Sequence, residues 1–293
     1  MGFLSCNDPV LHFGLGDADR IDEMTVQWPS GQQQILRDLE ADYTYTVVEP
    51  AAPTSSTMAT SKKTNVRAAS PRPLFVPSRR FPALKHTEIE FDDYARQPLL
   101  PYAHSQLGPG LAVGDVDGDG DFDFYLGRAK GARRAVYRNA GAGRLEVAQV
   151  FDEVEAEDLG ALFFDADRDG DRDLYVVSGS VECEPNDPSL RDRLYLNDGK
   201  GSFAEAADAL PEVRQSGSVV CAADYDRDGD LDLFVGGRVV PGQYPISPKS
   251  QLLGNDSESG KLGFSDRTAK VAPGLEEVGL VTSAVLSDVD GDG

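Results

Sequence analysis

Aspartate recurs at every second position in three stretches of the chain, and these stretches are its strongest chemical signal. They read DVDGDGDFD at 115–123, DADRDGDRD at 165–173 and DYDRDGDLD at 224–232. A fourth copy begins as DVDGDG at 288–293. Like charges at this density repel one another unless a cation neutralises them. The pattern therefore predicts cation-binding loops.

The spacing within each stretch suits calcium. Oxygen ligands at positions 1, 3 and 5, a carbonyl at 7 and a carboxylate at 9 can converge on Ca²⁺, which takes about six to eight oxygens. Glycine at position 6 permits the sharp turn. The candidate ligands are Asp115, Asp117, Asp119, Asp121 (carbonyl) and Asp123; Asp165, Asp167, Asp169, Asp171 (carbonyl) and Asp173; Asp224, Asp226, Asp228, Asp230 (carbonyl) and Asp232; and, in the incomplete copy, Asp288, Asp290 and Asp292. Mg²⁺ fits less well because it retains most of its water ligands.

An EF-hand begins in the same way, but it requires Glu at position 12 and a helix on each side. Position 12 is Leu126, Val176 and Val235 in the three complete stretches, each within an apolar run. An EF-hand is therefore excluded in each of the three complete stretches. The alternative to a calcium site is an exposed acidic turn that binds no ion.

The overall charge points to the same type of partner. The chain has 293 residues, a formal charge of −22 and 40% hydrophobic residues. Nucleic acid and anionic lipid require a basic surface, so we expect neither as a partner. The loops hold 18 of the 50 acidic residues, and three calcium ions would reduce the charge to −16.

No apolar run is long enough for a membrane span, and Cys6, Cys183 and Cys221 have no metal-type spacing.

Short apolar runs lie on both sides of each complete aspartate stretch, and their length and composition indicate strands. Each pair is followed by an Asn- and Gly-containing hairpin, so units of about four strands span 108–152, 158–207 and 216–269. Repeated four-stranded units predict a β-propeller. The fold class is therefore all-β: a partial propeller of three blades and the start of a fourth. The insertions at 182–193 and 238–250 are expected to be surface loops.

Composition divides the chain into three parts. Residues 1–50 alternate between apolar and polar and predict a small β module, whereas 51–80 are rich in Ala, Pro, Ser and Thr and predict a flexible linker. Residues 81–293 carry the repeats. Because the fourth aspartate stretch stops at its sixth position, we expect the chain to be part of a longer protein.

The quoted repeats resemble a known family. Together with DRLYLNDGKGSF, the aspartate stretches and their flanking strands are similar to the FG-GAP/VCBS repeats of integrin-type β-propellers. This resemblance implies that each loop joins the first two strands of a blade and binds calcium. It also implies a secreted or cell-surface protein that serves adhesion or binds a protein or carbohydrate ligand.

The N-terminal region resembles a second family. The motifs HFGLG at 12–16 and WPSG at 28–31 make residues 8–50 similar to the C-terminal part of the ASPIC/UnbV domain. That module usually follows such a propeller, whereas here it precedes the repeats.

No combination of a nucleophile and a base is recognisable, so we expect a binding protein rather than an enzyme. The alternative is a secreted enzyme acting on polysaccharide, with catalytic groups in the insertions or outside this chain. A pocket combining Asp187, Asp192 or Tyr244 with a perturbed pKa would favour the enzyme.

Overall fold

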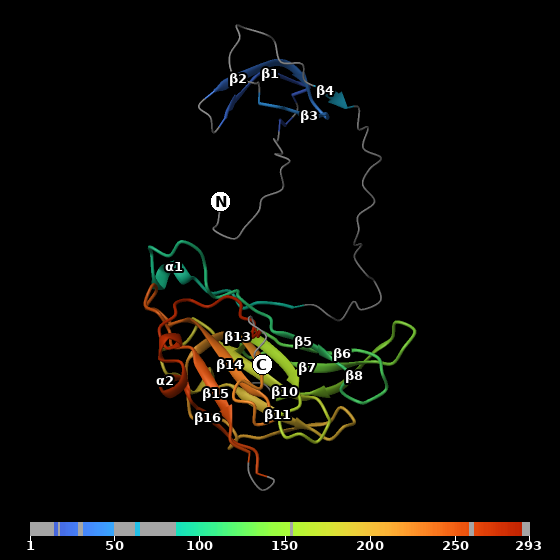
Figure 1. Ribbon diagram of the computed structural model, residues 1–293, viewed down its shortest axis with the longest axis vertical. Helices are drawn as coiled ribbons and strands as arrows, with labels where there is room; N and C mark the ends of the chain where they lie inside the picture. Colours follow the sequence, from blue (N-terminus) through green and yellow to red (C-terminus); the bar gives the residue numbers. More distant parts are fainter. Residues whose placement is uncertain are drawn as a thin grey trace. The chain divides into compact units, whose positions relative to one another are not determined.

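A computed structural model describes residues 15–16, 18–28, 32–49, 62–64, 86–152, 155–257 and 261–288. The chain forms two compact units, Met1–Pro77 and Ser78–Gly293. Strands dominate both units, which can be followed along the chain in Figure 1. No helix among the described residues has the length and apolar character needed to cross a membrane.

The first unit contains two pairs of antiparallel strands. Strand β1 (Arg20–Gln27) pairs with β2 (Gln33–Glu40), and β3 (Thr44–Thr46) pairs with β4 (Lys62–Thr64). Buried and exposed residues alternate over the first five residues of β2, and Leu39 is buried after the two exposed residues Arg37 and Asp38, as expected for a sheet with one covered face. Strand β4 lies inside the segment 51–80 that was expected to be a linker; the rest of that segment lies outside the described residues.

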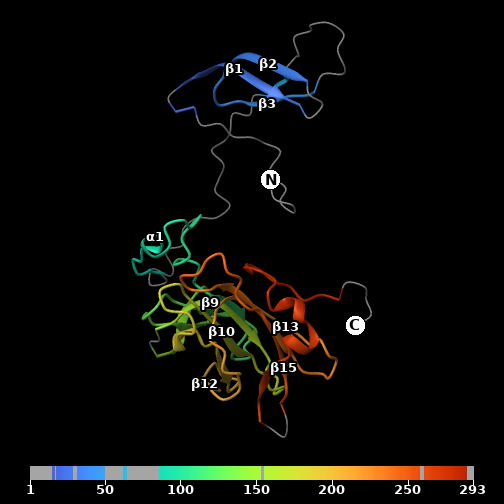
Figure 2. The same cartoon turned by 90° about the vertical axis from the view of Figure 1, so that its left-hand side faces the viewer.

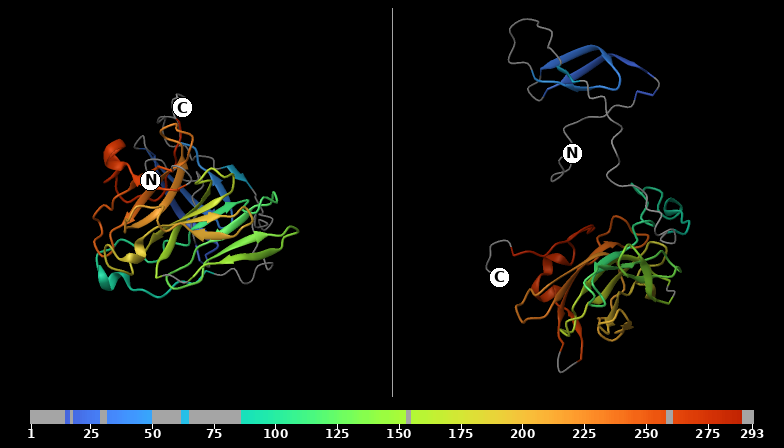
Figure 3. Two further views of the ribbon diagram at one scale, coloured as in Figure 1. Left: turned by 90° about the horizontal axis from the view of Figure 1, so that it is seen from below. Right: turned by 90° about the vertical axis from the view of Figure 1, so that its right-hand side faces the viewer.

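The second unit contains three four-stranded antiparallel sheets, each formed by strands in chain order. The first blade consists of β5 (Leu111–Gly114), β6 (Asp123–Leu126), β7 (Ala135–Asn139) and β8 (Leu145–Val150). The second consists of β9 (Glu157–Phe164), β10 (Asp173–Gly179), β11 (Arg193–Asn197) and β12 (Phe203–Glu205). The third consists of β13 (Ser216–Ala223), β14 (Asp232–Val239), β15 (Gln251–Asn255) and β16 (Phe264–Asp266). The predicted all-β, propeller-type repeat is confirmed, and Figures 2 and 3 show the blades in turned views.

Only short helices interrupt the strands. They are α1 (Asp93–Arg96), α2 (Thr268–Val271) and the 3₁₀ helices η1 (Pro188–Leu190) and η2 (Pro273–Leu275). The Asp92 carboxylate accepts hydrogen bonds from the first turn of α1, and Arg96 donates to the carbonyl oxygens of Val181 and Cys183 at 2.7 Å. This segment is thereby attached to the loop between β10 and β11.

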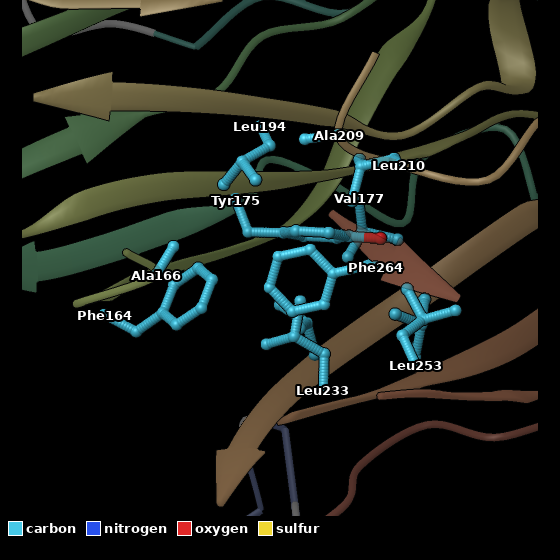
Figure 4. Packing of buried hydrophobic residues seen from close by; sticks show 12 residues of the cluster. Phe164, Ala166, Tyr175, Val177, Leu194, Ala209, Leu210, Leu233, Leu253 and Phe264 are labelled. Atoms are coloured by element: carbon cyan, nitrogen blue, oxygen red, sulfur yellow. The ribbon is translucent and has the colours of Figure 1, made fainter. Parts of the chain in front are cut away.

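The second blade is covered on both faces, which explains its continuous apolar runs. All seven residues of β10 are buried, and they alternate between two cores. Leu174 and Val176 pack against the first blade, in a cluster that includes Tyr125 and Val136. Tyr175 and Val177 pack against the third blade, and Figure 4 shows Tyr175 beside Phe264 of that blade and Leu194 of its own. Side-chain alternation along a strand thus joins three blades through one sheet.

The innermost strands approach one another too closely for larger side chains. A Cβ atom on Gly160 in β9 would lie 2.7 Å from the carbonyl oxygen of Ser218 in β13. A Cβ atom on Gly110, just before β5, would lie 2.9 Å from the Gly160 carbonyl carbon. Glycine at these two positions allows successive blades to pack backbone against backbone.

Two expectations about the second unit need correction. The apolar run TSAVLS at 282–287 was expected to begin a fourth blade, but it forms no strand among the described residues. Beside it, Val281 donates its N–H to the Gly237 carbonyl (2.9 Å) and accepts from the Ser218 hydroxyl (2.8 Å), and the Leu286 backbone hydrogen-bonds to the Cys221 side chain of β13. These contacts hold the run against the third blade without a strand ladder. The insertion at 182–193 is also not wholly superficial, because Leu190 is 1% exposed and Arg193 is 7% exposed.

A buried ionic cluster joins the first two blades. Asp158 in β9 is 0% exposed and accepts hydrogen bonds from Tyr125 Oη (2.8 Å), the Arg128 N–H (3.1 Å) and Arg193 Nη2 (2.6 Å). The guanidinium of Arg134, also 0% exposed, lies 3.3 Å from the same carboxylate. Asp158 is therefore the counter-ion of two buried arginines.

Its neighbour Glu157 is also buried, but no Lys or Arg of the described residues forms an ion pair with it. Glu157 is 2% exposed, and its carboxyl accepts the Gly108 N–H at 3.3 Å. Burial, reinforced by the charge of Glu88, raises the pKa of Glu157 to about 8. Adjacent acidic residues thus have different roles: Asp158 is the shared counter-ion of two arginines, and Glu157 holds a proton at neutral pH.

Replacing Asp158 with alanine should strongly destabilise the chain, because two guanidinium groups would stay buried without a counter-ion. We expect the free energy of unfolding to fall by about 3 to 5 kcal/mol, measured by urea denaturation in calcium. Asp152→Ala, at an exposed position nearby, is the control and should have little effect. A loss below about 1 kcal/mol for Asp158→Ala would contradict this role.

Glu157 should make the stability of the folded chain depend on pH. Its pKa rises from 4.5 in the unfolded state to about 8 in the folded state, so the native state binds an extra proton between these values. Its contribution to stability is complete below pH 4.5 and is lost as the pH rises through 8. In saturating calcium, the free energy of unfolding of the unmodified chain should fall between pH 6 and pH 8. For Glu157→Gln we expect this fall to be about 2 kcal/mol smaller. Exposed Glu155→Gln is the control, and identical pH profiles for all three proteins would refute the assignment.

Candidate metal centres

Each aspartate stretch forms a loop between the first two strands of a blade. The loops follow β5, β9 and β13 and end at the first residue of β6, β10 and β14. Glycine at position 6 has a positive φ in all three, +88° at Gly120, +96° at Gly170 and +95° at Gly229. This backbone conformation favours glycine and reverses the loop, as the sequence predicted.

The carboxylate at position 9 is buried and held by two segments of its blade. Asp123, Asp173 and Asp232 are no more than 1% exposed. In each, one oxygen accepts the backbone N–H of position 2 at 2.8–3.0 Å. The other accepts the N–H of the hairpin asparagine, at 2.8 Å from Asn139 and 2.9 Å from Asn197 and Asn255. These hydrogen bonds place the carboxylate identically in three blades.

The other aspartates shape the loop. The Asp115 carboxylate accepts the N–H groups of positions 4 and 6 at 2.8 and 3.0 Å, and Asp224 accepts those of positions 5 and 6 at 3.2 and 3.0 Å. Each position-5 carboxylate accepts the N–H of position 7, for example Asp119 from Asp121 at 2.8 Å. The acidic residues therefore cap the turn of their own loop.

Positions 1, 3 and 9 converge in every complete loop. One carboxylate oxygen from each member of a triad lies within 4.8 Å of the others. The triads are Asp115, Asp117 and Asp123; Asp165, Asp167 and Asp173; and Asp224, Asp226 and Asp232. Three hard oxygen donors at this separation suit Ca²⁺ and could hold it. The position-5 carboxylates do not join the triads, and their role as ligands, like that of the position-7 carbonyl oxygens, stays a prediction.

Electrostatics makes these triads costly without a cation. Burial raises the pKa of Asp123 and Asp232 and raises that of Asp173 to about 7, and the negative charges of the neighbouring loop aspartates act in the same direction. Among the described residues, none of the three forms a salt bridge with Lys or Arg. Arg138 lies 3.2 Å from Asp117, and Arg168 lies 3.4 Å from Asp230. The position-9 carboxylates therefore have the environment of metal ligands: buried, hydrogen-bonded and facing other carboxylates.

Sequence reasoning located the loops but missed two features. Arg168 and Arg227, at position 4, have φ of +64°, and the only hint was glycine at the matching position in the first loop, Gly118. The hairpin asparagines were interpreted as turn residues, although they also hold position 9. In the incomplete fourth loop Asp288 is exposed, whereas Asp290 and Asp292 lie outside the described residues.

The three residues considered for catalysis do not share a pocket. Asp192 accepts hydrogen bonds from Tyr175 Oη and the Ser178 N–H, both at 2.8 Å, and burial raises its pKa to about 7. It lines a cavity of about 10 Å³, which holds no more than one water. Tyr244 instead packs against His104, with ring centroids 5.2 Å apart.

Asp187 lines a larger cleft of about 790 Å³, together with Lys130, Glu182 and Cys183. A second cleft of about 470 Å³ lies between the loops at 182–193 and 238–250. Loops between the second and third strands of the blades line both clefts, together with the α1 segment in the first cleft and the connection from β12 to β13 in the second. In an antiparallel sheet, the loop between the first and second strands and the loop between the second and third strands lie at opposite ends. The aspartate loops therefore lie at one end of the sheets and these clefts at the other.

Mouse (Mus musculus) cartilage acidic protein 1 is 27% identical over 173 residues, which are 57% of this chain and 25% of that protein. The chain thus matches about a quarter of the length of this curated relative.

Two family models match separate parts of the chain. Residues 1–54 match the ASPIC and UnbV model, and residues 165–235 match the model for an FG-GAP-like repeat. The second match begins at Asp165, the first residue of the second aspartate loop, and extends through the third loop. The chain is therefore similar to ASPIC and UnbV in its first 54 residues and to an FG-GAP-like repeat at 165–235, where two of the three carboxylate triads lie.

Proposed function

We propose that this chain is part of an extracellular repeat protein in which calcium stabilises the blades and the opposite end of the blades binds a ligand. The observation that carries the calcium proposal is the buried position-9 carboxylate, which faces two further carboxylates in each complete loop. Burying an ionised carboxylate is costly unless a cation or hydrogen bonds compensate for it. A bound Ca²⁺ in each loop supplies the missing positive charge.

The proposed binding surface follows from the topology. Calcium in the loops between first and second strands would hold one end of each blade rigid. The clefts of about 790 and 470 Å³ lie at the other end, where insertions vary in length between blades. A rigid scaffold that presents variable loops is the usual arrangement for ligand binding. We propose a protein or carbohydrate ligand at the cell surface, with the function of adhesion or capture.

A second candidate function is hydrolysis of a polysaccharide, favoured by the larger cleft. Burial raises the pKa of Glu182, whereas a hydrogen bond from Ser189 lowers the pKa of Asp187. Two carboxyl groups with pKa values shifted in opposite directions are typical of a general acid and a general base. Release of reducing sugar from a polysaccharide panel, abolished by Glu182→Gln and by Asp187→Asn, would support this activity. If both variants match the unmodified chain, the candidate is rejected.

Calcium should raise the melting temperature of the chain. At roughly 1 mM Ca²⁺ and a Kd near 10⁻⁴ M, each site adds about 1.4 kcal/mol, so three sites add about 4 kcal/mol. We expect the melting temperature in calcium to exceed that in EDTA by about 10 °C. Scanning calorimetry measures this, with magnesium as the comparison ion.

A variant with Asn in place of Asp117, Asp167 and Asp226 should lose the calcium-dependent shift, and its melting temperature in EDTA should be no lower than that of the unmodified chain, because the triads then carry less charge. The matched control carries Glu146→Gln, Asp152→Asn and Glu205→Gln, which remove the same charge at exposed positions outside the loops. This control should keep the shift. Equal melting temperatures of the unmodified chain in calcium and in EDTA would reject the proposed role of calcium.

A further inference from the structure

Asn197, the last residue of β11, forms hydrogen bonds with two aspartate loops. It is 7% exposed, and its backbone N–H donates to Asp173 Oδ1 at 2.9 Å. Its side-chain Nδ2 donates to the Arg172 carbonyl in the same loop at 3.1 Å and to the Val116 carbonyl in the first loop at 2.8 Å. One amide group therefore connects position 8 of the second loop with position 2 of the first.

Asn255, the last residue of β15, repeats this arrangement one blade later. It is 4% exposed, and its N–H donates to Asp232 Oδ1 at 2.9 Å. Its Nδ2 donates to the Leu231 carbonyl at 3.4 Å and to the Ala166 carbonyl of the second loop at 2.9 Å. The same two positions are again connected across a blade boundary.

The position-2 residues complete a continuous series of hydrogen bonds. Val116 donates its N–H to Asp123 and accepts from Asn197, and Ala166 donates to Asp173 and accepts from Asn255. The series therefore links the three buried candidate ligands. In order, it contains Asp123, Val116, Asn197, Asp173, Ala166, Asn255 and Asp232. None of the seven is more than 7% exposed, so water does not compete for these bonds.

Further contacts cross the same boundaries. Arg168 at position 4 of the second loop lies 3.4 Å from the carboxylate of Asp230 at position 7 of the third. Asn139, the equivalent asparagine of the first blade, donates its N–H to Asp123, but its Nδ2 has no hydrogen-bond partner within the described part of the chain. Asn139 is thus an internal control: it has the same place in its hairpin without the bond to another loop.

We propose that the three loops bind calcium cooperatively, each coupled to the next through Asn197 and Asn255. This inference rests on the proposed binding of calcium. An ion held by positions 1, 3 and 9 restrains the peptide of position 2, which lies between two of its ligands. The restrained carbonyl orients the asparagine of the next blade, and that asparagine orients the position-9 carboxylate and position-8 carbonyl of its own loop. Ordering of one site therefore lowers the entropy cost of ordering its neighbour.

The arrangement predicts an asymmetry between the loops. The second loop takes part in both links, whereas the first and the third each take part in one. Coupling is reciprocal, so occupation of any site favours occupation of the sites linked to it. Removing the second site should uncouple the other two, but removing the third should leave the first two coupled.

Two matched variants of the full chain test this asymmetry. Asp165→Asn with Asp167→Asn removes the middle site, and Asp224→Asn with Asp226→Asn removes the last site. Calcium uptake is titrated in competition with a chromophoric chelator, and circular dichroism verifies that both variants are folded. We expect the middle variant to bind with a Hill coefficient near 1 and a midpoint about fivefold higher than the end variant, which stays cooperative.

The possible outcomes separate this inference from the proposed function. Absence of calcium uptake by the unmodified chain would overturn calcium binding, and the coupling with it. Uptake of calcium with the same midpoint and Hill coefficient in both variants would overturn the coupling alone. Different midpoints, with cooperativity only in the end variant, support it.

Asn197→Ala tests the link itself against Asn139→Ala. Both changes keep the backbone N–H that holds position 9, but only the first removes a bond to another loop. We expect Asn197→Ala to reduce the Hill coefficient and to raise the midpoint about fivefold, with no change for Asn139→Ala. Equal effects of both changes would show that the asparagine acts only within its own blade and would refute the coupling. If Asn197→Ala does not fold, the comparison of the two loop variants decides.

Discussion

The second unit depends on a carboxylate that is buried at the start of the second strand of each blade. Its two oxygens accept backbone N–H groups from the preceding loop and from the following hairpin, so it joins the first three strands at one end. A buried charge is tolerated only when such hydrogen bonds or a cation compensate for it. The position of this group therefore determines the loop, the turn and the candidate metal site together.

Packing between blades follows from the same strands. The second strand of the middle blade directs alternate side chains into two separate cores, one shared with each neighbouring blade. Glycine in the innermost strands lets the backbones approach, and the cluster around Asp158 places an ionic contact between the first two blades. Apolar packing and polar contacts thus both join the blades. At the aspartate loops, Asn197 and Asn255 add hydrogen bonds to the loop of the preceding blade.

The two ends of the blades have different properties. At one end the loops have the same length and nearly the same hydrogen bonds in three blades, because the geometry of the carboxylate triads leaves little freedom. At the other end the connections differ in length and line open clefts. A surface that varies between blades can acquire specificity without disturbing the loops that stabilise the fold.

Much of this organisation was predictable from the sequence. Alternating aspartates with glycine at position 6, flanked by short apolar runs, predicted the loops, the strands and the repeated four-stranded unit, because these patterns act over a few residues. The apolar run at 282–287 also predicted a strand, but a strand requires a regular ladder of backbone hydrogen bonds as well as a favourable composition. The described contacts of this run with the third blade are isolated bonds at Val281 and Leu286.

Other features were decided by tertiary structure alone. Composition cannot indicate that Glu157 and Asp158, adjacent in sequence, lie in such different surroundings that one has two arginines beside it and the other none. Sequence identified the asparagines of the hairpins as turn residues, whereas their contacts with the preceding blade exist only because the blades pack side by side. The residues of each candidate metal site are therefore encoded locally, but the connection between sites arises from contacts between segments distant in the chain.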